Sequence, residues 1–287
     1  MTEMKMERER DEPRTGAEGP DKAAVKVNDA IKIYKTGELE VVALRGLNLE
    51  VSKGEFVAIM GPSGCGKTTL LNLIGGMDRP TVGSIIVNNT DLSELDTDQA
   101  CDFRANTVGF VFQFFNLLPE LTARENVELP TRISNLGRKE RETRAQELLE
   151  LVDLEERGAH KPSQLSGGEQ QRIAIAAALA NHPPILLADE PTGELDSEAG
   201  AGILDLLRKL SKEEGRTIIV ATHDIRVARY ADRVLRILDG EILTQGPEDL
   251  TRLSQEASQR EEIEQLRNRV SELTDTLTRI RQSLAKT

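Results

Sequence analysis

Gly61-Pro62-Ser63-Gly64-Cys65-Gly66-Lys67-Thr68 is the stretch that decides the fold, and its spacing is G-x-x-x-x-G-K-[ST]. It follows an apolar run at residues 56–60, typical of a buried parallel strand, and a helix should begin near Lys67. The glycines let the backbone curl until several N–H groups point into one concavity, and the helix N-terminus adds partial positive charge. Lys67 can then bind the β- and γ-phosphates of a nucleotide, and the Thr68 hydroxyl can bind Mg²⁺. Because a strand and a helix flank it, the stretch predicts a phosphate-binding loop rather than a chance glycine-rich turn.

Two carboxylates, Asp189 and Glu190, directly follow another apolar run at residues 185–188. Ligand sites of α/β proteins form at the carboxyl ends of the strands, so we expect both side chains to lie beside the phosphate-binding loop. Asp189 would then hold Mg²⁺, and Glu190 would act as the general base on a water molecule aligned with the γ-phosphate. The alternative is that the pair only begins a solvated turn before Pro191, which is a weak interpretation beside a phosphate-binding loop.

Further apolar runs at residues 108–112 and 218–221 are separated by helical patterns such as 141–151 and 197–210. Alternating strands and helices predict an α/β fold, in a body that begins near Val25. The stretch at about 114–180 breaks the alternation and has a mostly helical pattern. We therefore expect a helical subdomain inserted into the α/β core.

The two ends of the chain differ in composition from this body. Residues 1–24 are rich in charges, Gly and Pro and carry almost nothing apolar, so we expect them to be disordered. Residues 247–287 are expected to form a helical extension. Apolar residues recur within it at spacings of three and four over 263–284, which predicts a short coiled coil, although an amphipathic helix packed on its own domain is the alternative. The apolar positions are Ile263, Leu266, Val270, Leu273, Leu277, Ile280 and Leu284.

Charge and composition exclude several classes of function. The 287 residues carry a formal net charge of −12, contain no Trp and are only 3% aromatic. Nucleic-acid binding needs a basic surface and often stacking side chains, so no nucleic-acid partner is expected. Cys65 and Cys101 cannot form a disulfide framework for a chain of this length, which fits a reducing compartment. No apolar run approaches the roughly 18–20 residues that a membrane helix needs.

The segment Leu165-Ser166-Gly167-Gly168-Glu169-Gln170-Gln171-Arg172 precedes an apolar helical run at residues 173–180. Ser166 is a plausible N-cap, and the two glycines leave backbone N–H groups available to an anion. This segment resembles the signature motif of the ABC ATPases, and its place before the carboxylate strand matches the order of that family. The resemblance covers roughly residues 25–246 and implies a P-loop NTPase core of the ABC type. The resemblance implies that Ser166, Gly167, Gly168 and Glu169 bind the nucleotide held by a second copy, in a head-to-tail dimer with two ATP molecules at its interface.

The same resemblance implies roles for single residues elsewhere in the chain. Gln113, after the strand at 108–112, resembles the glutamine that senses Mg²⁺, and His223 resembles the switch histidine that contacts the γ-phosphate. Tyr34 resembles the aromatic residue that stacks on adenine, and the alternative for it is simple packing at the end of a strand. The implied catalytic residues are Glu190, His223 and Gln113, and the implied metal ligands are Thr68, Gln113 and Asp189. The remaining implied nucleotide contacts are Gly61, Ser63, Gly64, Cys65, Gly66, Lys67, Thr68 and Thr69.

The segments 112–119, 121–127 and 191–197 are similar to those of the lipoprotein-release and macrolide-export (LolD/MacB-like) ATPases. Glu194 departs from that subgroup, which usually carries Asn there. The resemblance implies an ATP-hydrolysing subunit, cytoplasmic and peripheral on the inner face of the membrane, that powers an integral membrane permease on a separate chain. Two alternatives are a regulatory ATPase similar to the cell-division FtsE proteins, which switches a membrane complex without transport, and a soluble ABC protein acting on DNA or ribosomes.

Overall fold

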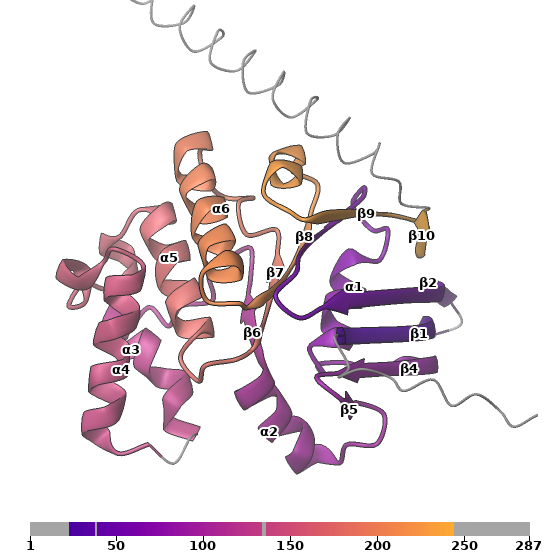
Figure 1. Cartoon of the computed structure of the whole chain (residues 1–287), viewed down its shortest axis with the longest axis horizontal. Helices are drawn as coiled ribbons and strands as arrows, with labels where there is room; N and C mark the ends of the chain where they lie inside the picture. Colours follow the sequence, from indigo (N-terminus) through magenta and orange to yellow (C-terminus); the bar gives the residue numbers. More distant parts are fainter. Residues whose placement is uncertain (1–22, 38, 134–135, 244–287) are drawn as a thin grey trace, which may run out of the picture.

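The computed structural model describes residues 23–37, 39–133 and 136–243. The expectations for residues 1–22 and for the coiled coil at 263–284 lie outside the described residues. Figure 1 shows a helical group on the left, a central sheet, and a second sheet with strands β1, β2 and β4 on the right.

The central sheet has six strands in the order β10-β9-β3-β8-β7-β6. They are β3 (Phe56–Met60), β6 (Val108–Val111), β7 (Ile185–Asp189), β8 (Thr217–Thr222), β9 (Arg233–Leu238) and β10 (Glu241–Leu243). The pairs from β9 to β6 are parallel, and β10 is antiparallel to β9. The four apolar runs predicted to be core strands coincide with β3, β6, β7 and β8. Helices cover both faces of a parallel sheet, which is why these strands are apolar runs rather than alternating ones.

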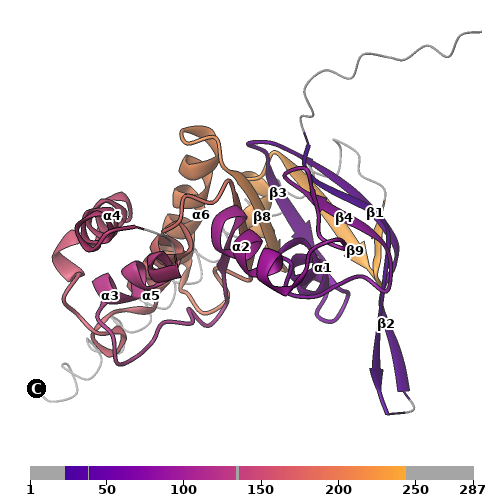
Figure 2. The same ribbon diagram turned by 90° about the horizontal axis from the view of Figure 1, so that it is seen from below.

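The second sheet is antiparallel, with strand order β2-β1-β4-β5. Its strands are β1 (Ala23–Thr36), β2 (Leu39–Ser52), β4 (Val82–Val87) and β5 (Thr90–Asp91). β1 begins two residues before the expected boundary of the body, because Ala23 and Ala24 are buried and the Ala24 carbonyl accepts a hydrogen bond from the Asn88 N–H. The far end of the β1–β2 hairpin projects from the body in Figure 2.

Helix α1 (Lys67–Ile74) lies between the two sheets and contacts β2 and β4 of one and β7 and β8 of the other. Successive side chains of a strand point to opposite faces, and β3 divides accordingly. Val57 and Ile59 pack with α1 and the antiparallel sheet, whereas Phe56, Ala58 and Met60 pack with helices on the other face. The central sheet therefore separates two apolar cores, and the phosphate-binding loop leaves it at the carboxyl end of β3.

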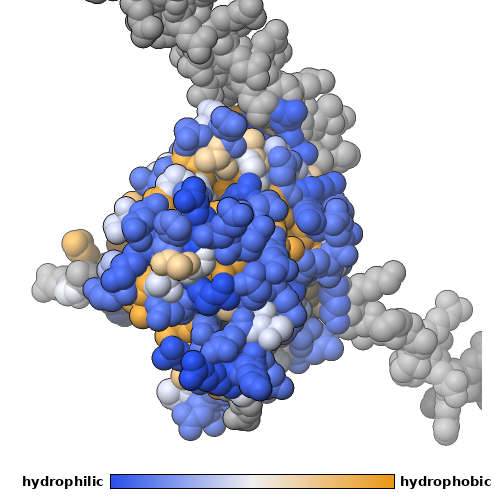
Figure 3. All heavy atoms as spheres, turned by 90° about the vertical axis from the view of Figure 1, so that its left-hand side faces the viewer, coloured by the Kyte–Doolittle hydropathy of each residue, from blue (hydrophilic) through white to orange (hydrophobic). Residues whose placement is uncertain are grey.

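The helical subdomain lies between β6 and β7 in the chain. It contains α3 (Ala123–Glu128), α4 (Arg138–Leu151), α5 (Gly167–Ala178) and the 3₁₀ turns η1 (Leu129–Ile133), η2 (Glu155–Arg157) and η3 (Pro162–Gln164). Helix α5 begins at Gly167, directly after the predicted N-cap Ser166, which forms a reciprocal capping box with Glu169. Figure 3 shows that the outer face of this subdomain is mainly hydrophilic, with apolar patches between.

The remaining helices connect these layers. They are α2 (Thr97–Thr107), α6 (Ser197–Lys212) and the 3₁₀ turn η4 (Ile225–Arg229). Asp196 caps α6 by accepting a hydrogen bond from the Ala199 N–H at 2.8 Å, so α6 begins close behind the carboxylates of β7. No helix among the described residues is long and apolar enough to cross a membrane.

Candidate functional site

The phosphate-binding loop bends sharply between β3 and α1. Gly64 and Gly66 have φ angles of +79° and +107°, in the region that favours glycine. A side chain on Gly66 would place its Cβ 2.6 Å from the Ala43 carbonyl oxygen, and one on Gly61 would clash with the Ile237 carbonyl oxygen. The neighbouring strands β2 and β9 therefore require glycine at these two positions.

Lys67 is held inside the curve of this loop. Its ammonium group donates to the carbonyl oxygens of Gly61 at 2.9 Å and Pro62 at 3.2 Å, and lies 3.8 Å from the Glu190 carboxylate. Only 7% of the side chain is exposed, so these contacts fix the ammonium group inside the loop. Of the other predicted contacts, Ser63, Gly64 and Thr68 are exposed, whereas Cys65 is buried.

Asp189 ends β7 beside the first turn of α1. Burial raises the pKa of its carboxyl group; a hydrogen bond with the Thr68 side chain opposes this shift, and the nearby Glu190 charge adds to it. Within the described residues, Asp189 Oδ1 is buried and has no hydrogen-bond partner. A buried carboxylate oxygen without a partner fits a divalent cation, which would supply the missing positive charge.

The Mg²⁺ expected from the sequence therefore suits the oxygen donors at this point. The described residues contain no cluster of three or more His, Cys, Asp or Glu side chains that could hold a metal alone. Mg²⁺ is usually bound by one or two protein oxygens together with substrate phosphates and water. Thr68 and Asp189 would hold it together with Gln113, the third ligand predicted from the sequence.

Glu190 lies where β7 and β8 end side by side, and its φ is +48°. Its carboxylate accepts hydrogen bonds from the Thr222 hydroxyl at 2.8 Å and the His223 N–H at 3.3 Å. The His223 ring Nδ1 lies 3.0 Å from the other carboxylate oxygen. The Glu190 side chain is only 15% exposed, so these contacts fix its direction. The predicted base and the predicted switch histidine thus meet directly.

Gln113 follows β6, the edge strand that pairs with β7. Its side-chain Nε2 donates to Glu194 Oε1 at 3.0 Å. The preceding residue is tied to the signature helix, because the buried Gln171 side chain of α5 donates to the Phe112 carbonyl oxygen at 3.4 Å. The loop that carries Gln113 is therefore linked both to the segment after Glu190 and to α5.

Tyr34 stands on β1 near the first turn of α1. Its hydroxyl donates to Asp78 Oδ2 at 2.8 Å and lies near the Thr69 side chain. The residue is 38% exposed, and the Lys32 ammonium lies 4.8 Å from the ring centroid. A partly exposed ring held in this way can receive a flat base.

The signature residues lie on the first turn of α5, in the helical subdomain. The Ser166 hydroxyl donates to Glu169 Oε2 at 2.9 Å, and Arg157 forms an ion pair with Glu169 at 3.2 Å. Gly167 lies against the turn that contains Glu194 and Leu195. The two glycine-rich stretches predicted to bind the nucleotide are thus on separate parts of the chain, at α1 in the core and at α5 in the subdomain (Figure 1).

The profile of the ABC transporter family matches residues 44–193, which include the phosphate-binding loop, the signature segment and both carboxylates. This chain belongs to the ABC transporter family.

Three similar proteins illustrate the relationship. An uncharacterized ABC transporter ATP-binding protein of Methanocaldococcus jannaschii is 53% identical over 222 residues, which cover 76% of this chain and 94% of that protein. The macrolide export ATP-binding/permease protein MacB of Marinobacter nauticus is 48% identical over 219 residues, but these cover only 34% of that protein. A dimeric ATP-binding cassette in a post-hydrolysis state, bound to ADP and Pi, superposes with a TM-score of 0.72 at 50% identity, covering 77% of this chain and 97% of that one.

Membership confirms the predicted fold class and the ABC ATPase resemblance. The chain is an ABC-type ATPase that binds and hydrolyses ATP, and similar cassettes form dimers in solved structures.

Sequence reasoning missed several residues of this ABC site. No role was predicted for Thr222, yet its hydroxyl donates a hydrogen bond to the predicted base Glu190. Asp224 is held by Arg226 and by the Thr192 hydroxyl at 3.2 Å, which braces the loop after His223. The positions of Thr222 and Asp224 in the sequence could have identified them. Polar residues at or just after the ends of parallel core strands gather at one edge of the sheet.

Proposed function

We propose that this chain is the ATP-driven motor of a membrane complex, in which Lys67 and the loop amides bind the ATP phosphates. Glu190 takes a proton from a water molecule aligned with the γ-phosphate, and Thr222 and His223 hold the Glu190 carboxylate in place. Mg²⁺ bound by Thr68, Asp189 and Gln113 would neutralise charge on the transferring phosphoryl group. The observation that carries the assignment is the meeting of Lys67, Asp189, Glu190 and His223 at one sheet edge.

The signature turn supports a head-to-tail pairing of two copies. Ser166 and the N–H groups of Gly167 and Gly168 lie at the N-terminus of α5, where an anion is favoured. Their contacts are with the helical subdomain and the turn at 193–195, away from the phosphate-binding loop of the same chain. A second copy would bring its own ATP to this turn, and closure of the dimer would complete both sites.

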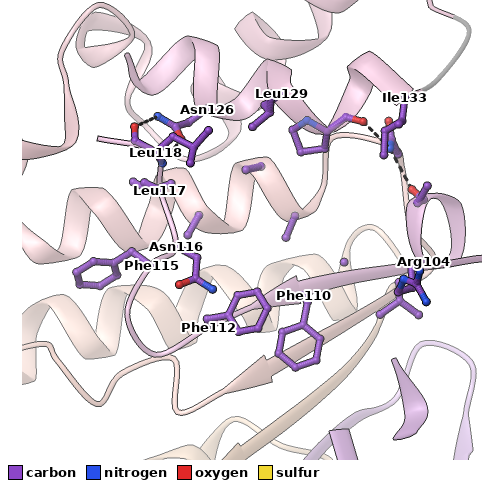
Figure 4. A pocket seen from close by; sticks show the side chains of 18 of the residues that line it. Arg104, Phe110, Phe112, Phe115, Asn116, Leu117, Leu118, Asn126, Leu129 and Ile133 are labelled. Atoms are coloured by element: carbon purple, nitrogen blue, oxygen red, sulfur yellow. Dashed lines mark hydrogen bonds between the residues drawn. The ribbon is translucent and has the colours of Figure 1, made fainter. Parts of the chain in front are cut away.

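An apolar groove beside Gln113 is the surface we assign to the membrane partner. It has a volume of about 500 Å³ and lies between β6 and the helical subdomain (Figure 4). Phe110 and Phe112 stack in it with their ring centroids 4.5 Å apart, and Ile133 at its rim is 75% exposed. Its walls are largely apolar, which suits the apolar face of a short amphipathic segment.

The loop that forms one wall of this groove is held rigidly. The buried Asn126 side chain accepts a hydrogen bond from the Leu118 N–H at 2.7 Å and donates to the Leu118, Leu121 and Thr122 carbonyl oxygens. Because the same loop begins at Gln113, a segment seated in the groove would move with the ATP site. We therefore propose an integral membrane permease on a separate chain as the occupant, and a location on the cytoplasmic face of the membrane.

A pull-down under turnover-blocked conditions tests this function. Tagged Glu190→Gln chain, solubilised from membranes with Mg·ATP present, should retain ATP, hydrolyse it at a small fraction of the wild-type rate and co-purify with a multi-span membrane protein. Undiminished hydrolysis by this variant would contradict the assigned base. Lys67→Ala should lose ATP binding, and unchanged affinity would refute the assigned phosphate-binding loop.

A matched pair of substitutions tests the groove. Ile133→Asp places a charge at the apolar rim, whereas Leu39→Asp places one at a residue that is 73% exposed on the β1–β2 hairpin. We expect Ile133→Asp to lose the membrane protein while keeping ATPase activity, and Leu39→Asp to retain both. Equal recovery with the two variants would refute the groove as the docking surface, and recovery of ribosomes or DNA instead would refute the membrane partner.

A further inference from the structure

A single hydrogen bond joins two functional loops that are far apart in the sequence. Gln113 Nε2 donates to Glu194 Oε1 at 3.0 Å across 81 residues. Glu194 belongs to the turn between Glu190 and α6, and Gln113 begins the loop that lines the groove. Neither the family membership nor the proposed catalytic roles require a carboxylate at residue 194.

The chemistry of the two groups makes this bond directional. A carboxylate can only accept hydrogen bonds, whereas a side-chain amide has an NH₂ end that donates and an oxygen end that accepts. Glu194 therefore selects one of the two amide orientations of Gln113, with NH₂ toward Glu194 and Oε1 away from it. An amide oxygen is a ligand for a hard divalent cation, and an NH₂ group is not.

The backbone around Glu194 is built to hold this contact. The Gly193 N–H donates to the Glu190 carbonyl oxygen at 3.0 Å, and the Leu195 N–H donates to the Thr192 carbonyl oxygen at 3.2 Å. A Cβ on Gly193 would lie 3.3 Å from Gln113 Nε2, so glycine leaves room for the amide. Asp196 then caps α6, which anchors the far end of the turn.

We propose that Glu194 is a positioning residue that holds Gln113 in the orientation able to bind the metal of Mg·ATP. This role rests on the proposed magnesium site. Glu194 acts through Gln113 and touches neither phosphate nor metal itself. It links the orientation of a metal ligand to the turn that lies against Gly167 of the signature, so movement of either loop reaches the metal ligand.

Metal affinity, measured without turnover, tests the proposal directly. The full chain, in excess over a non-hydrolysable ATP analogue, is titrated with Mn²⁺, and unbound Mn²⁺ is followed by electron paramagnetic resonance. Glu194→Gln keeps the size of the side chain but accepts either amide orientation. We expect it to weaken Mn²⁺ binding about three- to tenfold, the effect of one partly exposed hydrogen bond, while affinity for the analogue without metal stays the same. Glu198→Gln, an exposed carboxylate on the first turn of α6, is the matched control and should bind Mn²⁺ as the wild type does.

A double-mutant cycle separates orientation from simple charge. If Glu194 acts through Gln113, Glu194→Gln should cause no further loss of Mn²⁺ affinity in a Gln113→Ala background. An equal loss in both backgrounds would show a general charge effect and overturn the proposal, as would unchanged Mn²⁺ affinity of Glu194→Gln in the otherwise wild-type chain. Failure of the wild-type chain to bind Mn²⁺ with the analogue would instead refute the magnesium site itself.

Discussion

Replacing Thr222 by valine should slow ATP hydrolysis while leaving ATP binding nearly unchanged. Thr222 is fully buried, and its hydroxyl donates to Glu190 at 2.8 Å and accepts from the Asp224 N–H at 3.0 Å. Valine has nearly the same shape, so the substitution removes these hydrogen bonds without opening a cavity. A hydrogen bond to a charged group contributes about 1.5–3 kcal/mol, and the His223 contacts remain. If the lost bond acts mainly on the hydrolysis step, kcat should fall about 10- to 100-fold.

Steady-state release of phosphate by purified wild-type, Thr222→Val and Thr222→Ser chains measures this effect. Serine keeps the hydroxyl and should restore most of kcat, whereas KM for ATP should change less than about threefold in both variants because Lys67 and the loop amides are untouched. A wild-type kcat in Thr222→Val, or equal loss of kcat in the valine and serine variants, would refute the role assigned to the hydroxyl.

Three further outcomes are expected. Gly66→Ala should lose nucleotide binding and melt at a lower temperature, because its Cβ would lie 2.6 Å from the Ala43 carbonyl oxygen at a φ of +107°. Calorimetry measures the melting temperature and nucleotide titration measures the affinity. Wild-type values of both would contradict the argument. The pKa of Asp189 is raised in the folded state, so its contribution to stability is present at low pH and lost as pH rises through that raised pKa. At pH 7 in the presence of a chelator, Asp189→Asn should therefore have a higher melting temperature than the wild type. Addition of Mg·ATP should raise the melting temperature of the variant less than that of the wild type. A lower melting temperature of the variant in chelator would contradict the predicted direction of the effect. A chain ending at residue 246 should keep its ATPase activity but lose any nucleotide-independent dimer formed by residues 263–284. Light scattering without nucleotide measures the molecular mass of the particle in solution. The same number of chains per particle in the full and the shortened protein would argue for a helix packed on its own domain.

The strands and loops that carry the proposed catalytic groups were predictable because their signals are local. Residues 56–60 and 185–188 are short apolar runs that end in glycine or carboxylates, and each becomes a buried parallel strand. Helix α2 was not predicted, since only Phe103 on it is buried and its apolar face is correspondingly weak. The edge strand β5 was missed because its two residues, Thr90 and Asp91, are both polar. The inner strand β4 was also missed, although Ile85 and Val87 on it are buried.

The sequence by itself determined which chemical groups the chain offers, since a phosphate-binding loop, a carboxylate pair and a signature turn are each set by spacing over a few residues. The position of the carboxylate pair after an apolar strand also predicted that it lies beside the phosphate-binding loop, but only the tertiary structure decided the strand order and the contacts. Strands β3, β8 and β7 lie side by side although they are far apart in the chain, and this order brings Lys67, Glu190 and Thr222 together. The contact between Gln113 and Glu194 depends in the same way on β6 pairing with β7. Strand order follows from burying both faces of the sheet, a property of the whole core that no local pattern of residues specifies.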